Sequence, residues 1–322
     1  AHMLAELIEN GLAFSPPDFD VELHGRIIDD GIPPEYDRFG PWIDEVRTVD
    51  ELPRLYRDAG IDPAAYRRVL KVPRDIEGRN THPTMHLYDY LLAVNEETFT
   101  VLARRDEAFY TVHVPLDRIA AIVDSVRLLN GRLTVHTVDG PVVTVVYNAS
   151  ASAPVRDLML LLRKFYLPEG PAVEAEPYRG AEPAMDPEDT GLLTDYHRLM
   201  AEEPGMRLVN IADRQVVTPL HRPDRLWSTQ WPTTLHASIT VADHREIQII
   251  HRRDWFTGNG DKLSLARTIL PRARITDIRV DPHRRYEGVH VLTIQAGATR
   301  MEFPLATGPL VEAKLAGDSV SI

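Results

Sequence analysis

The sequence predicts an α+β fold in which two similar antiparallel β-sheet modules follow each other in the chain. The stretch "VLARRDEAF" at 101–109 returns as "IIHRRDWF" at 249–256, 148 positions later. Both copies sit among short segments that alternate apolar and polar residues and are separated by turn formers, which is typical of β-hairpins. An amphipathic segment at 152–166 follows the strands of the first copy and predicts a closing C-terminal helix.

The two copies align over a hairpin. Phe99 corresponds to Ile247, and Val101 corresponds to Ile249. The polar tips are Asn95-Glu96-Glu97 in the first copy and Asp243-His244-Arg245 in the second. A polar tip between alternating strands predicts the same hairpin twice.

The correspondence resumes downstream of the hairpin. "VPLDRIAAI" at 114–122 matches "LPRARITDI" at 270–278, and "GRLTVHTVDG" at 131–140 matches "HVLTIQAG" at 290–297. Eight extra residues in the second copy surround "TGNGDKLS" at 257–264. Because these are turn and loop formers, we expect the insertion to lengthen a connection without disturbing the core.

Turns and a helix are expected at the end of the first copy. Asn130-Gly131 predicts a two-residue hairpin turn, and Asp139-Gly140 predicts another. Ser152 is expected to cap the helix, with Pro154 in its first turn. One face of this helix should carry the apolar residues Val155, Leu158, Met159, Leu162 and Phe165. The matching C-terminal tail of the second copy, "TGPLVEAKLAGDSV", is shorter.

Composition predicts four segments. Residues 1–50 form an acidic N-terminal arm, and residues 168–189, rich in Pro, Glu and Ala, form a linker. Residues 51–167 and 190–322 each hold a helical prelude and one β-sheet module. Both preludes, at 51–70 and 191–209, predict a helix, a break and a second helical turn.

A run of six or seven antiparallel strands followed by one amphipathic helix resembles a pleckstrin-homology-like (PH-like) domain. The likeness covers 86–167 and 232–316 and includes the phrase "VPLDRIAAI". It implies a bent barrel or sheet of strands plugged by the C-terminal helix, and it implies a binding scaffold. Phosphoinositide-binding members place basic residues beside the first hairpin. Glu96 and Glu97 have the wrong sign for that, so anionic lipid is not an expected partner.

The charge of the chain narrows the classes of partner. The net charge is −12, and residues 1–60 hold 14 acidic residues against five basic ones. Nucleic acid is therefore not an expected partner. No apolar run reaches the length of a transmembrane helix, and no secretory signal is recognisable. With no cysteine, disulfides and thiolate chemistry are excluded, and we expect a cytoplasmic protein.

Two arginine pairs are the first candidate binding residues. Arg104 and Arg105 precede Asp106, and Arg252 and Arg253 precede Asp254. Guanidinium groups bind carboxylates in a bidentate manner, so these pairs could clamp an anionic ligand. The alternative is a structural salt bridge at a strand end, repeated because the fold is repeated.

A second candidate is the stretch "LHRPDRLWSTQWPTTLH" at 220–236. Arginines beside large aromatic side chains are typical of recognition surfaces, although they could equally hold the second prelude onto its sheet. The residues concerned are Arg222, Arg225, Trp227 and Trp231. His82 and His86 are weak metal candidates, because Pro83 disfavours a helix that would align them.

These observations favour a non-enzymatic binding or adaptor protein that recognises a protein or peptide partner. An enzyme, such as a hydrolase with His221, His236 and His251 in a cleft between the modules, is the first alternative. A self-assembling structural protein is the second, with a homo-oligomer as its product. No glycine-rich phosphate loop or nucleophile-elbow motif is present, so no cofactor and no catalytic residue are assigned.

Overall fold

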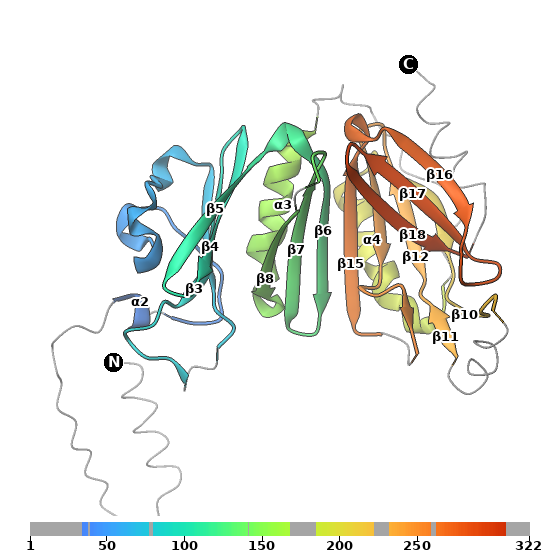
Figure 1. Cartoon of the computed structure of the whole chain (residues 1–322), viewed down its shortest axis with the longest axis horizontal. Coiled ribbons are helices and arrows are strands. Elements are labelled where there is room, and N and C mark those ends of the chain that lie inside the picture. The colour runs from blue at the N-terminus through green and yellow to red at the C-terminus, as the bar shows by residue number, and fades with distance from the viewer. Residues whose placement is uncertain are drawn as a thin grey trace, which may run out of the picture.

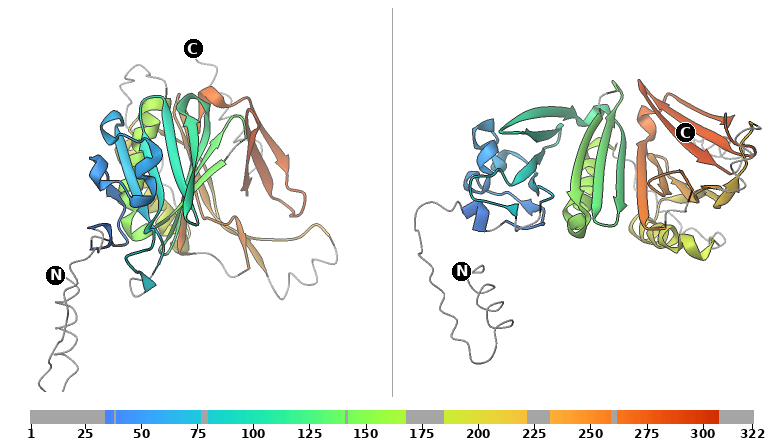
Figure 2. Two further views of the ribbon diagram at one scale, coloured as in Figure 1. Left: turned by 60° about the vertical axis from the view of Figure 1, so that its left-hand side comes forward. Right: turned by 60° about the horizontal axis from the view of Figure 1, so that its bottom comes forward.

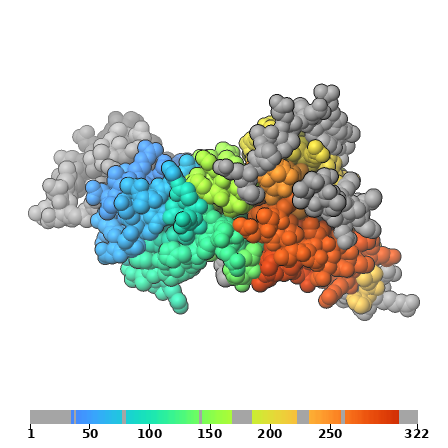
Figure 3. Space-filling model, turned by 90° about the horizontal axis from the view of Figure 1, so that it is seen from above, coloured from blue at the N-terminus to red at the C-terminus, as the bar shows by residue number. Residues whose placement is uncertain are grey.

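The chain is a mixed α+β protein in which antiparallel sheets dominate, as a computed structural model shows (Figure 1). The structure describes residues 34–37, 39–76, 80–140, 142–167, 185–221, 232–258 and 262–306. Two sheets organise the fold: one of five strands and one of seven. Figure 3 shows the N-terminal half and the C-terminal half side by side along the molecule.

The five-stranded sheet belongs to the first copy and has the order β1-β2-β3-β4-β5. Its neighbours are antiparallel throughout. The strands are β1 (Asp44–Glu45), β2 (Arg68–Pro73), β3 (Tyr88–Val94), β4 (Thr98–Arg105) and β5 (Ala108–Pro115).

The seven-stranded sheet takes strands from both copies, in the order β8-β7-β6-β15-β13-β12-β9 (Figures 1 and 2). The first copy supplies β6 (Ile119–Arg127), β7 (Asn130–Thr137) and β8 (Val142–Asn148). The second copy supplies β9 (Arg207–Ala212), β12 (Ser238–Ala242), β13 (Glu246–His251) and β15 (Ser264–Pro271). The two copies are therefore joined by main-chain pairing between β6 and β15.

Two three-stranded sheets complete the second copy. One is the meander β16 (Asp277–Pro282), β17 (His290–Ala296) and β18 (Thr299–Leu305). The other joins β10 (Gln215–Val217), β11 (Thr233–Leu235) and β14 (Phe256–Thr257), and the described part of the first copy has no equivalent of it.

Few helices cover the sheets. The longer ones are α3 (Ser152–Tyr166) and α4 (Thr190–Glu202), and α2 (Pro34–Asp37) is a single turn. None of the helices in the described ranges has the length and apolar character needed to cross a lipid bilayer. The 3₁₀ turns are η1 (Val49–Glu51), η2 (Arg54–Ala59), η3 (Pro63–Ala65), η5 (Leu116–Arg118), η6 (Ala149–Ala151), η7 (Pro187–Asp189) and η8 (Arg272–Arg274).

The predicted repeat is confirmed at the level of hydrogen bonds in the first hairpin of each copy. Val94 pairs with Phe99, and Ala242 pairs with Ile247, as the alignment requires. Asn95 Oδ1 accepts hydrogen bonds from the backbone N–H groups of Glu97 and Thr98, at 3.0 and 2.7 Å. Asp243 Oδ1 accepts the equivalent pair at 2.8 and 2.7 Å. Each turn is thus fixed by its own side-chain cap.

The eight-residue insertion lies where it was predicted, between β13 and β15. Beyond it the copies correspond again at a spacing of 156 rather than 148. The N–H of Leu116 donates to the carbonyl of Glu97, and the N–H of Arg272 donates to the carbonyl of Arg245, both at 2.8 Å. A proline precedes a 3₁₀ turn in each copy.

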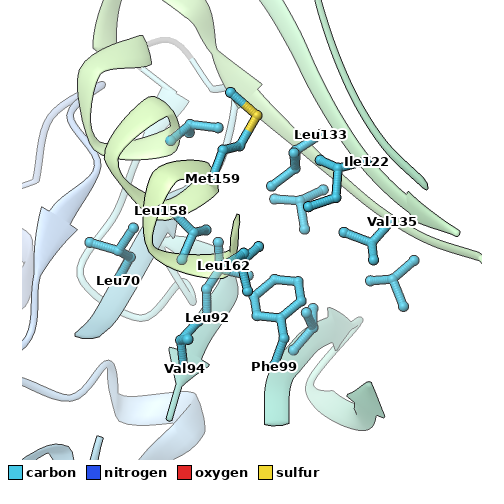
Figure 4. Close-up of a cluster of buried hydrophobic side chains, with 14 of the residues drawn as sticks. Leu70, Leu92, Val94, Phe99, Ile122, Leu133, Val135, Leu158, Met159 and Leu162 are labelled. Atoms are coloured by element: carbon cyan, nitrogen blue, oxygen red, sulfur yellow. The ribbon is translucent and has the colours of Figure 1, made fainter. Parts of the chain in front are cut away.

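Each copy builds its core between a four-stranded unit and a three-stranded meander. In the first copy, Leu92 and Phe99 from the five-stranded sheet share one core cluster with Ile122 and Leu133 from the seven-stranded sheet. Leu158 of α3 belongs to the same cluster (Figure 4). In the second copy, side chains from β13 meet side chains from β17 and β18: Ile247, Ile249, Leu292, Ile294 and Phe303.

The expectation of a barrel is wrong in one respect: no barrel closes within the described residues. Closure of the first copy would require β5 to lie beside β6. Instead β6 donates its outer edge to β15 of the second copy, with Ile122 opposite Ile269 and Arg127 opposite Ser264. The β5 edge is left without a partner strand among the described residues.

Local corrections concern a turn, a cap and the preludes. The first turn of the meander uses Leu128 and Leu129, with Leu128 at φ +54°, rather than Asn130-Gly131. Gly131 instead lies under the ring of Tyr147, where a Cβ would approach within 2.4 Å. Ala151, not Ser152, occupies the N-cap of α3. The "second helical turn" of each prelude is a strand, β2 or β9, which pairs with β3 or β12.

Several expectations fall outside the described residues. They concern most of the acidic arm (1–33), most of the linker (168–184) and the C-terminal tail of the second copy (307–322). The last five linker residues are described, and Asp189 among them is buried.

Candidate interaction surfaces

The β6–β15 ladder is the main junction between the two copies. At its centre Asp124 lies opposite Arg267, whose guanidinium also donates to Asp195 of α4 at 2.9 and 3.2 Å. Tyr147 donates its hydroxyl proton to Asp124 at 2.7 Å. Burial raises the pKa of Asp124, and the bond from Tyr147 and the charge of Arg267 oppose this rise. The junction therefore combines a continuous backbone ladder with one cluster of charged side chains.

A buried ion pair ties α3 of the first copy to the second copy. Arg163 donates to both carboxylate oxygens of Glu246, at 2.5 and 3.3 Å, and to Glu203 at 2.8 Å. Gln248 donates a further bond to Glu246 at 2.6 Å. The Glu246 side chain is fully buried (0% exposed). Desolvation raises the pKa of its carboxyl, although Arg163 works against the shift.

Two hairpin turns make a close backbone contact beside this junction. The N–H of Ala298 donates to the carbonyl of Val138 at 2.7 Å, and the hydroxyl of Thr299 donates to the carbonyl of Thr137 at 2.6 Å. Gly297 has φ +60°, and a Cβ there would lie 2.3 Å from the Val138 carbonyl oxygen. The turn of the second copy therefore requires glycine to dock on the first.

The first Arg-Arg-Asp triple ends β4 and begins the turn to β5. Arg104 donates to Asp89 at 2.8 Å and to the carbonyl of Asp106 at 3.1 Å. Asp106 has φ +56° in the turn. Arg105 is exposed. The structure thus engages Arg104 in an intramolecular ion pair, as the salt-bridge alternative requires.

The second triple lies just beyond β13 instead of on a strand. Arg252 is buried and donates to Asp189 at 3.0 Å, and its guanidinium also bonds the carbonyls of Glu188, Lys262 and Ser264. Arg253 donates to Asn130 of the first copy at 2.9 Å. Asp254 lies 3.8 Å from Arg127. These side chains hold the loop and the copy junction together.

The predicted aromatic surface cannot be placed, because Arg222, Arg225, Trp227 and Trp231 lie outside the described residues. His82 is exposed, and His86 lies 3.2 Å from Glu107. Across the described ranges, no group of three or more His, Cys, Asp or Glu side chains could hold a metal ion.

The three histidines of the hydrolase alternative do not line the cavities between the copies. His236 is buried and shares a 2.9 Å hydrogen bond with Thr257. His251 is buried between Thr268 and the carbonyl of Arg252 and stacks on Trp255 at 4.5 Å between ring centres. Burial lowers the pKa of His251 to about 4. His221 is exposed.

A concave groove lies between the two copies. It holds a cavity of about 440 Å³, next to a second of about 490 Å³ that shares Asp117 and Arg274 with it. The first is lined by Glu96, Glu97, Thr98, Pro115, Leu116, Asp117, Phe165, Tyr166 and Arg274. The groove is acidic and open, and its described lining contains no histidine.

Among the terminal strands whose outer edge has no partner strand within the described residues are β5 and β16. β5 reads "AFYTVHVP" and carries no Lys, Arg, Asp or Glu. Its Tyr110 is 54% exposed. Natural edge strands usually carry charges or bulges that prevent pairing, so a long uncharged edge is a candidate binding surface.

Sequence reasoning did not identify β5 and β16 as open edges. It also missed the Arg163–Glu246 pair, since 83 positions separate its members. The one available signal was Glu246, the acidic residue at the start of a strand that also carries Ile247, Ile249 and Ile250.

No protein-family model, curated protein or solved structure matches this chain. The geometry of the surfaces described above therefore carries the functional argument by itself.

Proposed function

We propose that this chain is a non-enzymatic binding or adaptor protein that takes up an extended segment of a partner at the edge of β5. One observation carries the proposal. The corresponding strand of the second copy, β15, already binds a strand along the same edge, over the six residue pairs from Ser264–Arg127 to Ile269–Ile122. This kind of edge therefore accepts strand addition, a common mode of peptide recognition.

The hydrogen-bonding groups of β5 support this proposal. The turn Asp106-Glu107 has two residues, so the flanking pair Arg105–Ala108 is hydrogen bonded. Pairs then alternate along the ladder, which leaves the N–H and C=O groups of Phe109, Thr111 and His113 pointing away from β4. Pro115 falls in the same outward series, where its missing N–H costs no bond to β4.

We also propose that each copy is a PH-like unit and that the protein works in the cytoplasm. The order of strands β2 to β5, strands β6 to β8 and the helix α3 in the first copy supports the PH-like assignment. The chain contains no cysteine, which suits a reducing compartment.

A binding function is better supported than a hydrolase. The groove between the copies offers carboxylates, Thr98 and Tyr166, but its described lining pairs no nucleophile with a histidine base. The three candidate histidines lie elsewhere or are held in internal hydrogen bonds.

A peptide-display library selected against the whole protein tests the proposal. We expect enriched peptides to alternate apolar and polar residues and to slow hydrogen exchange at Phe109, Thr111 and His113. Thr111→Pro removes an outward N–H without breaking the β4 ladder and should abolish binding. Thr144→Pro is the matched control, because it alters the edge of a different sheet, at the terminal strand β8 of the seven-stranded sheet. Peptides that bind Thr111→Pro as well as wild type would contradict strand addition at β5.

A further inference from the structure

The internal junction joins two different kinds of edge. β15 is the fourth strand of the second copy and corresponds to β5 of the first, at a spacing of 156 positions. β6 opens the meander of the first copy and corresponds to β16 of the second, at the same spacing. The chain thus uses one β5-type edge and one β6-type edge internally. It leaves one of each kind, β5 and β16, unpaired within the described residues (Figure 1).

We propose that the strand taken up by β5 is β16 of a second copy of this chain, so that chains associate head to tail. This inference rests on the proposed function, because it names the partner of the same edge. The internal junction is the template: each new contact repeats the β15–β6 pairing one copy further along.

The template fixes the register. Each β15 residue corresponds to the β5 residue 156 positions earlier, and each β6 residue corresponds to the β16 residue 156 positions later. The pair Arg267–Asp124 therefore becomes Thr111–Val280, and Ile269–Ile122 becomes His113–Ile278. The same shift turns Ala266–Ser125 into Tyr110–Asp281. The outward N–H groups agree with this register. The two-residue turn Gly297-Ala298 makes Ala296–Thr299 a hydrogen-bonded pair, so Ile278, Val280 and Pro282 point away from β17.

The facing side chains are compatible. On one face, Thr111 and His113 would meet Val280 and Ile278, and no charged group is brought into contact. On the other face Tyr110 would meet Asp281, which can accept a bond from the phenol. No like charges oppose each other in these pairs.

Exposure distinguishes the free edges from the template. Along β15 every residue is buried or half-buried. Of the six residues that β5 would contribute, 108–113, four are exposed, and Phe109 and Val112 are half-buried. β16 is likewise exposed or half-buried throughout. Pro282 lacks an N–H and would remove one bond at the end of the new ladder, opposite Phe109. The contact should therefore be weaker than the internal one and depend on protein concentration.

A single β5–β16 contact between two chains leaves one β5 edge and one β16 edge free. Each chain offers one β5 and one β16, so association continues into filaments or closes into a ring. Sedimentation velocity over a wide concentration range tests this. We expect species larger than a dimer for wild type and for Thr144→Pro, and monomers for Thr111→Pro and for Val280→Pro alone.

Mixing provides the sharper test. Thr111→Pro retains a good β16, and Val280→Pro retains a good β5, so an equimolar mixture should form a dimer and nothing larger. Monomers in that mixture, or assembly that survives in either single variant, would overturn the inference. The melting temperature of each variant confirms that it is folded.

Cross-linking tests the register, since the chain has no native cysteine. Chains carrying Tyr110→Cys, mixed with chains carrying Asp281→Cys, should form a disulfide-linked heterodimer on mild oxidation, and each variant alone should not give the same linked peptide. Failure to link, or equal linking of Tyr110→Cys with Arg279→Cys, would contradict the register. If Val280→Pro still binds selected peptides while wild type stays monomeric, this inference fails and the proposed function stands. Loss of peptide binding at β5 would instead remove both.

Discussion

Replacing Arg163 with methionine should destabilise the protein strongly, and the loss should depend on pH. The substitution leaves the fully buried Glu246 with Gln248 as its remaining described hydrogen-bond donor. Removing one partner of a buried ion pair typically costs about 3–5 kcal/mol. Part of the Glu203 interaction, at 2.8 Å, is lost as well.

The pH dependence follows from the pKa of Glu246. Burial already raises this pKa above its usual value of 4.5, and loss of Arg163 removes the charge that opposes the rise. A carboxyl with a higher pKa in the folded state holds its proton more tightly when folded, so stability falls as pH rises through that interval. The free-energy loss in Arg163→Met should therefore be smaller at pH 4.5 than at pH 7.5.

Urea unfolding of the whole chain at both pH values measures this difference. The double variant Arg163→Met with Glu246→Met should recover much of the loss, because apolar side chains of similar size often replace buried ion pairs without penalty. Arg156→Met, on an exposed position of the same helix, is the matched control. A loss below about 1 kcal/mol at pH 7.5, or a double variant no more stable than the single one, would refute the reasoning.

Three further outcomes follow from the described contacts. His251, whose pKa burial lowers to about 4, binds fewer protons when folded than when unfolded. Stability should therefore fall by about 3 kcal/mol as pH drops from 6.5 to 4, and His251→Gln should flatten that part of an unfolding profile measured from pH 4 to 7. Gly297→Val should weaken the contact between the two turns, because its Cβ would clash with the Val138 carbonyl oxygen. Hydrogen exchange at Ala298 should become faster, with exchange in β12 and β13 unaffected. Unchanged exchange at Ala298 would contradict this expectation. Arg252→Ala should lower the free energy of unfolding by about 3–5 kcal/mol, because Asp189 is left buried without its guanidinium partner. Arg104→Ala should lower it less, because Asp89 is partly exposed. Equal melting temperatures for the two variants would contradict this ranking.

Local features of the fold could be predicted from the sequence because local residues determine them. Asn95 and Asp243 each cap their own hairpin turn, and the alternation around Phe99 and Ile247 sets which side chains face the core. The apolar face of α3 was predicted for the same reason: helical spacing places Leu158 and Leu162 together.

The partner of an edge strand is not a local property. Alternation in β6 indicates which residues face the core, but it does not say whether the strand pairs with β5 or with β15. Gly131 shows a related ambiguity. Beside Asn130 it suggested a turn, but it is needed because the ring of Tyr147 lies over it. The buried charges of the junction could not be paired for the same reason, since 83 positions separate Arg163 from Glu246.

The two copies share one sheet through the β6–β15 ladder, in which Ser125 lies opposite Ala266. Ser125 and Ala266 are directly opposite, small and buried, and they lie at a position between hydrogen-bonded pairs, where Cα atoms approach closely enough for a disulfide. The double variant Ser125→Cys with Ala266→Cys should form an intramolecular disulfide, identified by mass spectrometry of the linked peptides. The shifted pair Ser125→Cys with Thr268→Cys should remain reduced. An unlinked first pair, or equal linking of both, would contradict the shared sheet.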